Sequence, residues 1–355
     1  MSVAKTQKAL ILPAEGAQWQ LGESPIPTPG PKDVLVKLAA TALNPLDWKI
    51  RTLGAFLISS YPFVGGSDGA GIVEEVGSEV SHFTQGDRVL FQGWVENPKA
   101  TFQQYAIVPA EIVAKVPDNI TLDEAASIPL GLATIVTALY NHDPKSITAD
   151  FPAPWEEGGT TKFSGKPAFI IGGASSVGQY AIQMAKLSGF SPIITTASPH
   201  NESLLRSLGA SHVLARSLSP AEIKNEVVKL TEGKPIEFVY DTISHADTEA
   251  LAYEVLAPGG VLVIVLPDLI PAELKKEGDN KKIVQAMGNV HIPHNRHVGA
   301  ELYAHLTEWL QTGKVVPNRI EVLPNGLAGI PEGLERLENN KVSGTKLIVR
   351  PQETP

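Results

Sequence analysis

The sequence of 355 residues contains no cysteine at all. This absence excludes disulfides and thiolate ligands, which are the usual ligands of structural zinc sites. Basic residues are also in short supply, since 29 lysines and arginines stand against 38 aspartates and glutamates and leave a formal net charge of -9. Because a polyanion attracts positively charged surfaces, we do not expect nucleic acid as a partner.

Long hydrophobic runs are missing too. The nearest candidate, Gly259 to Ile270, is interrupted by Pro267 and Asp268 and falls short of the roughly 18 apolar residues that span a bilayer. The segment Met1 to Gly16 lacks the design of a signal peptide, because its short apolar run stops at Pro13. We therefore expect no membrane association and a cytosolic location.

What the sequence does have is a hydrophobic fraction of 43% and a length that favours two domains. The first part is predicted to be β-rich, because short apolar runs are separated by Gly, Pro and Asp turns. These runs are Val34 to Leu38, Gly71 to Val76, Arg88 to Phe91 and Tyr105 to Val108.

The pattern changes near Leu122. A helix is predicted over Leu122 to Tyr140, then an irregular excursion over Asn141 to Lys166, and then strands that alternate with helices. This alternation predicts an α/β domain with a doubly wound parallel sheet. The expected strand and helix pairs are 168–171 with 177–188, 192–196 with 202–208, and 238–241 with 246–256, followed by strands 261–266 and 284–292.

The final part predicts one amphipathic helix over Gly299 to Gly313 and a strand-like run over Lys346 to Arg350. This run has no partner nearby in the sequence, so we expect it to return to the first domain and make that domain discontinuous. The predicted domains are residues 1–125 completed by 293–355, and residues 126–292.

A glycine-rich turn follows the first strand of the second domain. Gly173 and Gly178 hold the outer glycine positions of G-x-G-x-x-G, whereas Ser175 replaces the central glycine. Small residues allow the backbone to approach a pyrophosphate at a helix N-terminus. A tight turn without a ligand is the alternative for the motif alone. In its strand-to-helix context we expect the cofactor contacts Gly173, Ser175, Ser176, Val177 and Gly178.

The next strand ends at Thr196 without an acidic residue at its tip. An acid there binds the ribose 2′-hydroxyl of NAD and repels the phosphate of NADP, so its absence favours NADPH. Arg216 either pairs with that phosphate or is a solvated surface residue. The expected contacts on this side of the cofactor are Ser198, His200, Asn201 and Arg216.

Three motifs of the first domain then carry a resemblance. They are Asn44-Pro45-Leu46-Asp47-Trp48-Lys49, Gly66 to Gly77, and Gly86-Asp87-Arg88-Val89. Together with the glycine-rich turn, they resemble the medium-chain dehydrogenase/reductases from Lys8 to Arg350, and most of all their zinc-free quinone and enoyl reductase branch with the fungal stand-alone enoyl reductases. The resemblance implies a Rossmann domain and a discontinuous GroES-like domain.

The resemblance also implies site residues. Where zinc alcohol dehydrogenases of this fold hold their catalytic metal, this sequence has Asn44, Ser67 and Leu130, so we expect no metal there. His291, His294 and His297 cluster, but Pro293 between them argues against a metal site. The implied catalytic residues are Lys49, Thr134 and Asn44, and Leu266, His291 and Ile292 are implied cofactor contacts.

The expected reaction is NADPH-dependent reduction of the carbon-carbon double bond of an α,β-unsaturated carbonyl compound such as an enal, an enone or an enoyl thioester. Hydride addition places charge on the carbonyl oxygen, which organic donors can stabilise without a metal. The alternatives are a trans-acting enoyl reductase whose substrate is borne by an acyl carrier protein, a quinone oxidoreductase, and a non-catalytic dinucleotide-binding protein. The chain is expected to be a monomer or a homodimer.

Overall fold

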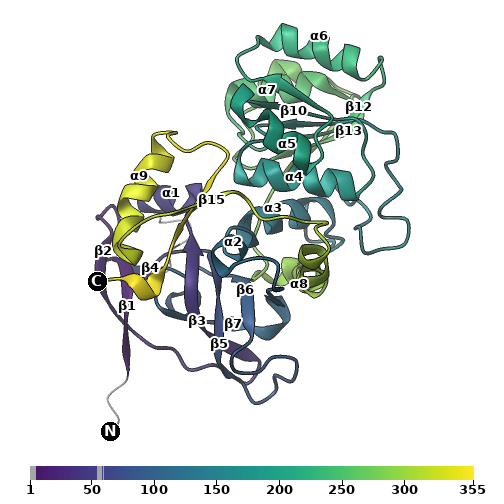
Figure 1. Cartoon of the computed structure of the whole chain (residues 1–355). Helices are drawn as coiled ribbons and strands as arrows, with labels where there is room; N and C mark the ends of the chain where they lie inside the picture. Colours follow the sequence, from purple (N-terminus) through teal and green to yellow (C-terminus); the bar gives the residue numbers. More distant parts are fainter. Residues whose placement is uncertain (1–4, 54–57, 59) are drawn as a thin grey trace. The chain divides into compact units, whose positions relative to one another are not determined.

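The computed structural model describes residues 5–53, 58 and 60–355. The chain divides into two compact units, each drawn with its elements in Figure 1. The first comprises residues up to 130 together with 300–313 and 317–355, and the second comprises residues 131–299 and 314–316. The functional domain limits proposed from the sequence fall close to these units and stay a prediction.

The first unit is built on a sheet with strand order β15-β16-β3-β5-β6-β8, and β7 also pairs with β3. A second sheet has the order β2-β1-β4. The strands are β1 (Thr6–Leu12), β2 (Gln20–Pro25), β3 (Asp33–Ala42), β4 (Phe63–Val64), β5 (Asp68–Val76), β6 (Arg88–Gln92), β7 (Tyr105–Pro109), β8 (Val113–Lys115), β15 (Ile320–Val322) and β16 (Lys346–Val349). The helices are α1 (Pro45–Leu53), α2 (Leu122–Ala125) and α9 (Ile330–Glu338), together with most of α8 (Arg296–Gln311).

The C-terminal strand β16 joins the first unit, as the sequence predicts. It pairs antiparallel with the end of β3, where Ile348 lies opposite Ala42, and all four of its residues are buried. The amide of Leu43 also donates to the Leu347 carbonyl at 2.9 Å. Because a strand without a sheet leaves its backbone groups unpaired, this return completes the hydrogen bonding of both segments.

The second unit contains a parallel sheet with the order β11-β10-β9-β12-β13-β14. Its core is rich in Ile, Leu and Val, as expected of strands buried on both faces. The strands are β9 (Ala168–Ile171), β10 (Ile193–Ala197), β11 (His212–Ala215), β12 (Ile236–Asp241), β13 (Leu256–Ile264) and β14 (Lys282–Gln285). The helices are α3 (Pro129–Leu139), α4 (Ser176–Leu187), α5 (Glu202–Leu208), α6 (Pro220–Leu230) and α7 (Ala246–Val255).

Two predicted elements differ in the structure. The helix expected over 122–140 is split into α2 and α3, because a capping box at Thr121 starts the first helix and Pro129 begins the second. The strand expected over 284–292 is wrong beyond Gln285, since β14 ends there and Pro293–Asn295 forms a 3₁₀ turn. The rest of the predicted strand contains Gly288 and Asn289, residue types that strands disfavour.

The segment Leu122–Leu139 is apolar enough, and at 18 residues long enough, to cross a membrane by composition. The expectation that no apolar stretch reaches this length is therefore corrected. In the structure 78% of this segment, which comprises α2 and α3, is buried inside the protein.

The excursion between α3 and β9 has no helix or strand, as predicted. Its start is fixed by Asn141, whose side-chain amide donates to the His294 carbonyl at 2.9 Å and to Asn295 Oδ1 at 2.8 Å. Its second half is fixed by Phe163, which stacks on Phe190 with ring centroids 4.4 Å apart. Aromatic packing therefore anchors the excursion to the rest of the second unit.

Candidate active site

The glycine-rich turn links β9 to α4 with the close backbone packing that a phosphate site requires. Gly172 has φ +76°, and a Cβ on Gly178 would lie 2.3 Å from the Gly172 carbonyl oxygen. A Cβ on Gly173 would lie 2.2 Å from Thr195 Oγ1. Larger residues at 173 and 178 would push the strand and helix apart, so the turn has little room for anything but glycine.

Ser175 acts as the N-cap of α4. Its hydroxyl accepts a hydrogen bond from the Gly178 amide at 2.9 Å and lies 2.9 Å from Thr242 Oγ1. Thr242 follows β12, and its hydroxyl donates to the Ile171 carbonyl at 2.8 Å. The Ser175 side chain is therefore used to hold the turn, and its backbone amide donates to the Gly172 carbonyl at 2.9 Å.

The carboxyl ends of β10 and β11 place two predicted cofactor residues side by side. Ala197 and Ala215 are paired, and the Arg216 amide donates to the Ala197 carbonyl at 2.9 Å. Ser198 and Arg216 each come directly after this pair. Ser198 is half-buried and Arg216 is exposed, so both side chains can reach a ligand at this edge.

The other two residues predicted near Ser198 lie in the short 3₁₀ turn Pro199–Asn201. His200 is exposed and Asn201 is buried, with Asn201 Nδ2 lying 3.3 Å from His200 Nε2. The structure therefore brings Ser198, His200, Asn201 and Arg216 to one edge of the sheet.

A second group of predicted residues meets near α3. Thr134 is 9% exposed, and its carbonyl accepts a hydrogen bond from the buried Tyr240 hydroxyl at 3.1 Å. A Cβ on Gly288 would lie 2.2 Å from Thr134 Oγ1, so the segment after β14 packs directly on Thr134. That segment continues to His291 and Ile292, both half-buried.

The position of His291 is fixed through its backbone. Its amide donates to Asn289 Oδ1 at 2.8 Å, and its carbonyl accepts a hydrogen bond from the Arg296 guanidinium at 2.9 Å. Leu266 lies just past the end of β13 and is half-buried. Thr134 thus packs against Gly288, which precedes His291 by three residues in the chain.

The first unit contains a buried polar cluster around Asn44. The Asn44 amide group donates to Asp68 Oδ2 at 2.8 Å, and its oxygen accepts a hydrogen bond from Lys346 Nζ. Lys346 Nζ also lies 3.1 Å from Asp68 Oδ2, and the other oxygen of Asp68 accepts the Leu130 amide at 2.6 Å. Both ends of the Asn44 amide are therefore engaged within the protein.

The helix after Asn44 carries Asp47 and Lys49. The backbone N–H of Asn44 donates to Asp47 Oδ2 at 2.7 Å. Burial raises the pKa of Asp47 to about 7, the bond from Asn44 opposes this rise, and the nearby charge of Asp68 adds to it. Lys49 is half-buried, its Nζ lies 5.5 Å from the centroid of the Trp48 ring, and partial burial lowers the pKa of its ammonium group.

With this geometry in place, comparison with known proteins identifies the family. The alcohol dehydrogenase GroES-like domain matches residues 30–118, and the zinc-binding dehydrogenase domain matches residues 176–267. A trans-enoyl reductase of Aspergillus flavipes is 31% identical over 98% of this chain and 99% of its own length. A trans-enoyl reductase of Aspergillus japonicus is 34% identical over 89% of each chain.

The chain belongs to the medium-chain dehydrogenase/reductase superfamily, in its quinone and enoyl reductase branch. This confirms the resemblance seen in the sequence. A quinone oxidoreductase structure from Pseudomonas syringae pv. Tomato DC3000 has the same fold, with a TM-score of 0.77 at 24% identity over 96% of this chain and 99% of the other.

The second matching domain is that of zinc-binding dehydrogenases, so we ask whether this chain has residues that could bind zinc. At the three positions that the resemblance assigns to metal ligands, Asn44 is engaged by Asp68 and Lys346, Ser67 offers only a hydroxyl, and Leu130 offers no donor in its side chain. Within residues 5–53, 58 and 60–355, no group of three His, Asp or Glu side chains is placed to hold a metal ion. The donor set does not fit zinc.

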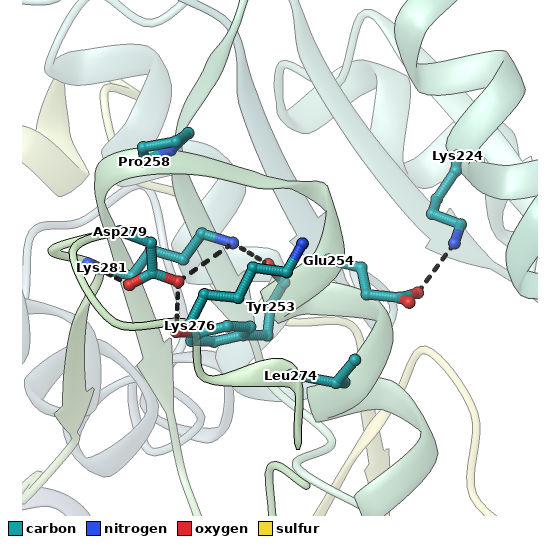
Figure 2. A pocket seen from close by; sticks show the side chains of 8 residues that line it. All are labelled: Lys224, Tyr253, Glu254, Pro258, Leu274, Lys276, Asp279 and Lys281. Carbon is teal, nitrogen blue, oxygen red and sulfur yellow. Dashed lines mark hydrogen bonds and ion pairs between the residues drawn. The ribbon is translucent and has the colours of Figure 1, made fainter. Parts of the chain in front are cut away.

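A cavity of about 360 Å³ lies in the second unit, at the amino ends of β13 and β14. Figure 2 shows Tyr253 and Lys281 in it, next to Pro258 near the start of β13. The predicted cofactor residues instead follow the carboxyl ends of β9, β10, β11 and β13. In parallel α/β sheets ligands bind outside the carboxyl ends, so this cavity belongs to the opposite edge of the sheet.

Sequence reasoning missed three polar residues that support predicted site residues within each unit. Asp68 lies within one of the family motifs, and Lys346 begins an otherwise apolar strand, which was a readable signal for an inward-facing charge. Asp241 ends β12, and its Oδ1 accepts the amides of Ile243 and Ser244 at 2.9 and 3.0 Å. An acid at the carboxyl end of a predicted strand was a second readable signal.

Proposed function

We propose that this medium-chain reductase is an enoyl reductase that uses NADPH to reduce the carbon-carbon double bond of an α,β-unsaturated carbonyl compound, without a metal. The observation that carries the proposal is the donor set around Asn44, which replaces the ligands of a Lewis acid with an amide already bound to Asp68 and Lys346. The relatives named trans-enoyl reductases, which align over nearly the whole chain, support the same reaction.

The residues of the second unit support cofactor binding. The tight turn of Gly173 and Gly178 brings backbone amides at the start of α4 toward a pyrophosphate, whose charge the helix N-terminus stabilises. Ser198 and Arg216, adjacent at the sheet edge, suit the 2′-phosphate that distinguishes NADPH from NADH. When bound, the cofactor supplies hydride to the β carbon of the substrate.

Stabilisation of the enolate falls to organic donors. We assign this role to the Lys49 ammonium group, which burial makes more acidic and therefore a better hydrogen-bond donor to a developing oxyanion. Thr134 is the donor that we assign to the nicotinamide side. Asn44 is better described as a positioning residue, since both ends of its amide are bonded to other side chains.

The substrate, the cellular location and the oligomeric state are also part of the proposal. We favour a small conjugated enal or enone, with a carrier-bound enoyl thioester as the second candidate because the relatives are named trans-enoyl reductases. The net charge of -9 gives no electrostatic help to an acidic carrier protein. A cytosolic location suits the fold of this reductase family, and a monomer or homodimer stays a prediction.

The test is turnover with a panel of substrates. Purified protein is mixed with NADPH and, in parallel, with an enal, an enone, an enoyl thioester and a quinone, and loss of cofactor absorbance is followed with product analysis by mass spectrometry. We expect saturated aldehyde, ketone or thioester products. Turnover of the quinone alone, or no turnover with any acceptor, would contradict the proposed function.

A further inference from the structure

A lysine side chain is buried beside Asn44 in the first unit. Lys346 lies on β16 with its side chain 4% exposed, and its ion-pair partner Asp68 is 0% exposed. Burying an ammonium group is costly unless an anion and hydrogen-bond acceptors surround it. Lys346 has both, since it contacts the Asp68 carboxylate and the Asn44 side-chain oxygen.

The pair also engages the positions where metal ligands would be expected. Asn44 bonds to both Lys346 and Asp68 through the two ends of its amide. The Leu130 amide donates to the second oxygen of Asp68 at 2.6 Å. Two of the three positions that the resemblance assigns to ligands are therefore hydrogen-bonded to this one ion pair.

The network continues from the pair into α1. Two hydrogen bonds fix the orientation of the Asn44 side-chain amide. Lys346 donates to its oxygen, and its nitrogen donates to Asp68. The backbone amide of the same residue donates to Asp47 Oδ2, in the first turn of the helix that carries Lys49. Asn44 therefore links the ion pair to the start of α1.

We propose that the buried ion pair of Lys346 and Asp68 positions Asn44 and the start of α1 for catalysis. The Lys346 charge neutralises Asp68, and its ammonium group holds the Asn44 side-chain oxygen. The positioning part of this inference rests on the proposed function, whereas the charge pairing does not. Lys346 acts through Asn44 and α1 and is a positioning residue.

A double-mutant cycle tests the charge pairing without any assay of activity. Lys346→Met and Asp68→Asn each leave one buried charge without its partner, so each should lower the midpoint of thermal unfolding by roughly 5 to 15 °C. The double variant has neither charge and should regain at least half of the larger loss. Arg336→Met is the control, because Arg336 forms a bidentate ion pair with Glu321 that is partly exposed to solvent.

Single variants that fail to fold while the double variant folds would support the pairing equally. Single variants that unfold within about 2 °C of the unmodified protein would overturn it, as would a double variant no more stable than the singles. Lys346→Arg keeps the charge and should retain more stability than Lys346→Met.

Kinetics of the folded double variant test the positioning role. Because Asn44 loses the ion pair that orients it, kcat should fall by about 10-fold or more, while the Kd for NADPH stays within about 2-fold. Arg336→Met should change neither quantity. A double variant with full kcat would overturn the positioning role, and an inactive unmodified protein with intact charge pairing would instead count against the proposed function.

Discussion

Lys49 is a residue whose partial burial changes its chemistry. Burial lowers the pKa of its ammonium group, and a more acidic donor forms a stronger hydrogen bond with a developing oxyanion. We expect Lys49→Ala to reduce turnover by about 10- to 1000-fold, the range for loss of one transition-state donor. Steady-state kinetics with the best enal or enone gives the measurement.

The matched control for this prediction is Lys32→Ala, because the Lys32 side chain is 84% exposed and its Nζ lies 3.9 Å from the exposed Glu79 carboxylate. That variant should retain full turnover. The assignment of Lys49 is wrong if the two alanine variants have the same kcat, or if the loss in Lys49→Ala is confined to cofactor affinity.

Arg216 should determine cofactor choice. It is exposed, follows β11 directly, and lies beside the residue that follows β10. If it pairs with the 2′-phosphate, Arg216→Ala should weaken NADPH binding by roughly 1 to 3 kcal/mol and leave NADH binding unchanged. Titration of both cofactors measures this. The control is Arg206→Ala on α5, where Arg206 is paired with Glu202 at 2.8 Å; equal weakening of both cofactors by Arg216→Ala would refute the role.

Asp47 should make stability depend on pH. Burial raises its pKa from 3.8 in the unfolded reference to about 7 in the folded protein. Between about pH 4 and pH 7 the folded state thus keeps a proton that the unfolded chain has released, and the free energy of unfolding falls as pH rises through this window. Asp47→Asn removes the titration and keeps an oxygen that can accept the Asn44 amide.

Thermal unfolding of both proteins from pH 4 to pH 8 checks this prediction. The stability of Asp47→Asn relative to the unmodified protein should increase across the window and level off above about pH 7. A stability difference that stays constant over the whole range would show that Asp47 is ionised in the folded protein already at low pH.

The glycine turn could be predicted from the sequence, whereas the pairing of Asp68 with Lys346 could not. The glycine turn was readable because strand, small residues and helix follow in order, and the structure gives Gly173 and Gly178 the close contacts that require glycine. The cluster of Asp68 and Lys346 was not readable as a pair, because the two lie far apart in the chain and meet only after β16 joins β3. Their pairing depends on tertiary structure alone.

At the scale of elements, the turn from β9 to α4 gives a prediction. A Cβ on Gly178 would lie 2.3 Å from the Gly172 carbonyl oxygen, which is backbone and cannot move aside as a side chain can. Gly178→Ala should therefore displace the start of α4 and weaken NADPH binding by about 10-fold or more. Fluorescence titration of the cofactor provides the measurement.

Gly233→Ala controls for the general effect of adding a methyl group to a glycine of this unit. Gly233 has φ +76° and nothing within 4 Å of an added Cβ, so the variant carries backbone strain but no clash. It should lose some stability and bind NADPH normally. Normal binding by Gly178→Ala would mean that the turn is not the pyrophosphate site.

Most helices and strands with a clear hydrophobic period were predictable from the sequence. Their first and last residues were less predictable. The strand Ala168–Ile171 was predicted at both ends because a turn follows it directly. The split between α2 and α3 was missed because the apolar pattern runs on through Pro129, although a proline at a helix start is a known signal. Short edge strands such as β15 carry too few residues to show a period.

At the scale of the whole molecule, the discontinuous first domain was foreseen from one argument. A final apolar strand without a local partner must pair elsewhere, and β16 pairs with β3. The fold class and family are confirmed by the match to two domain models and by relatives that cover nearly the full chain. The substrate could not be foreseen, because loop side chains that recognise it leave no periodic pattern.

The fate of the hydride tests the central claim most directly. The protein is incubated with NADPH carrying deuterium at the transferred position and with a conjugated enal, and the product is analysed by NMR. Because the donor set around Asn44 does not fit a Lewis acid, we predict a saturated aldehyde with deuterium on its β carbon and its carbonyl intact. An allylic alcohol with deuterium on the carbinol carbon would contradict the account.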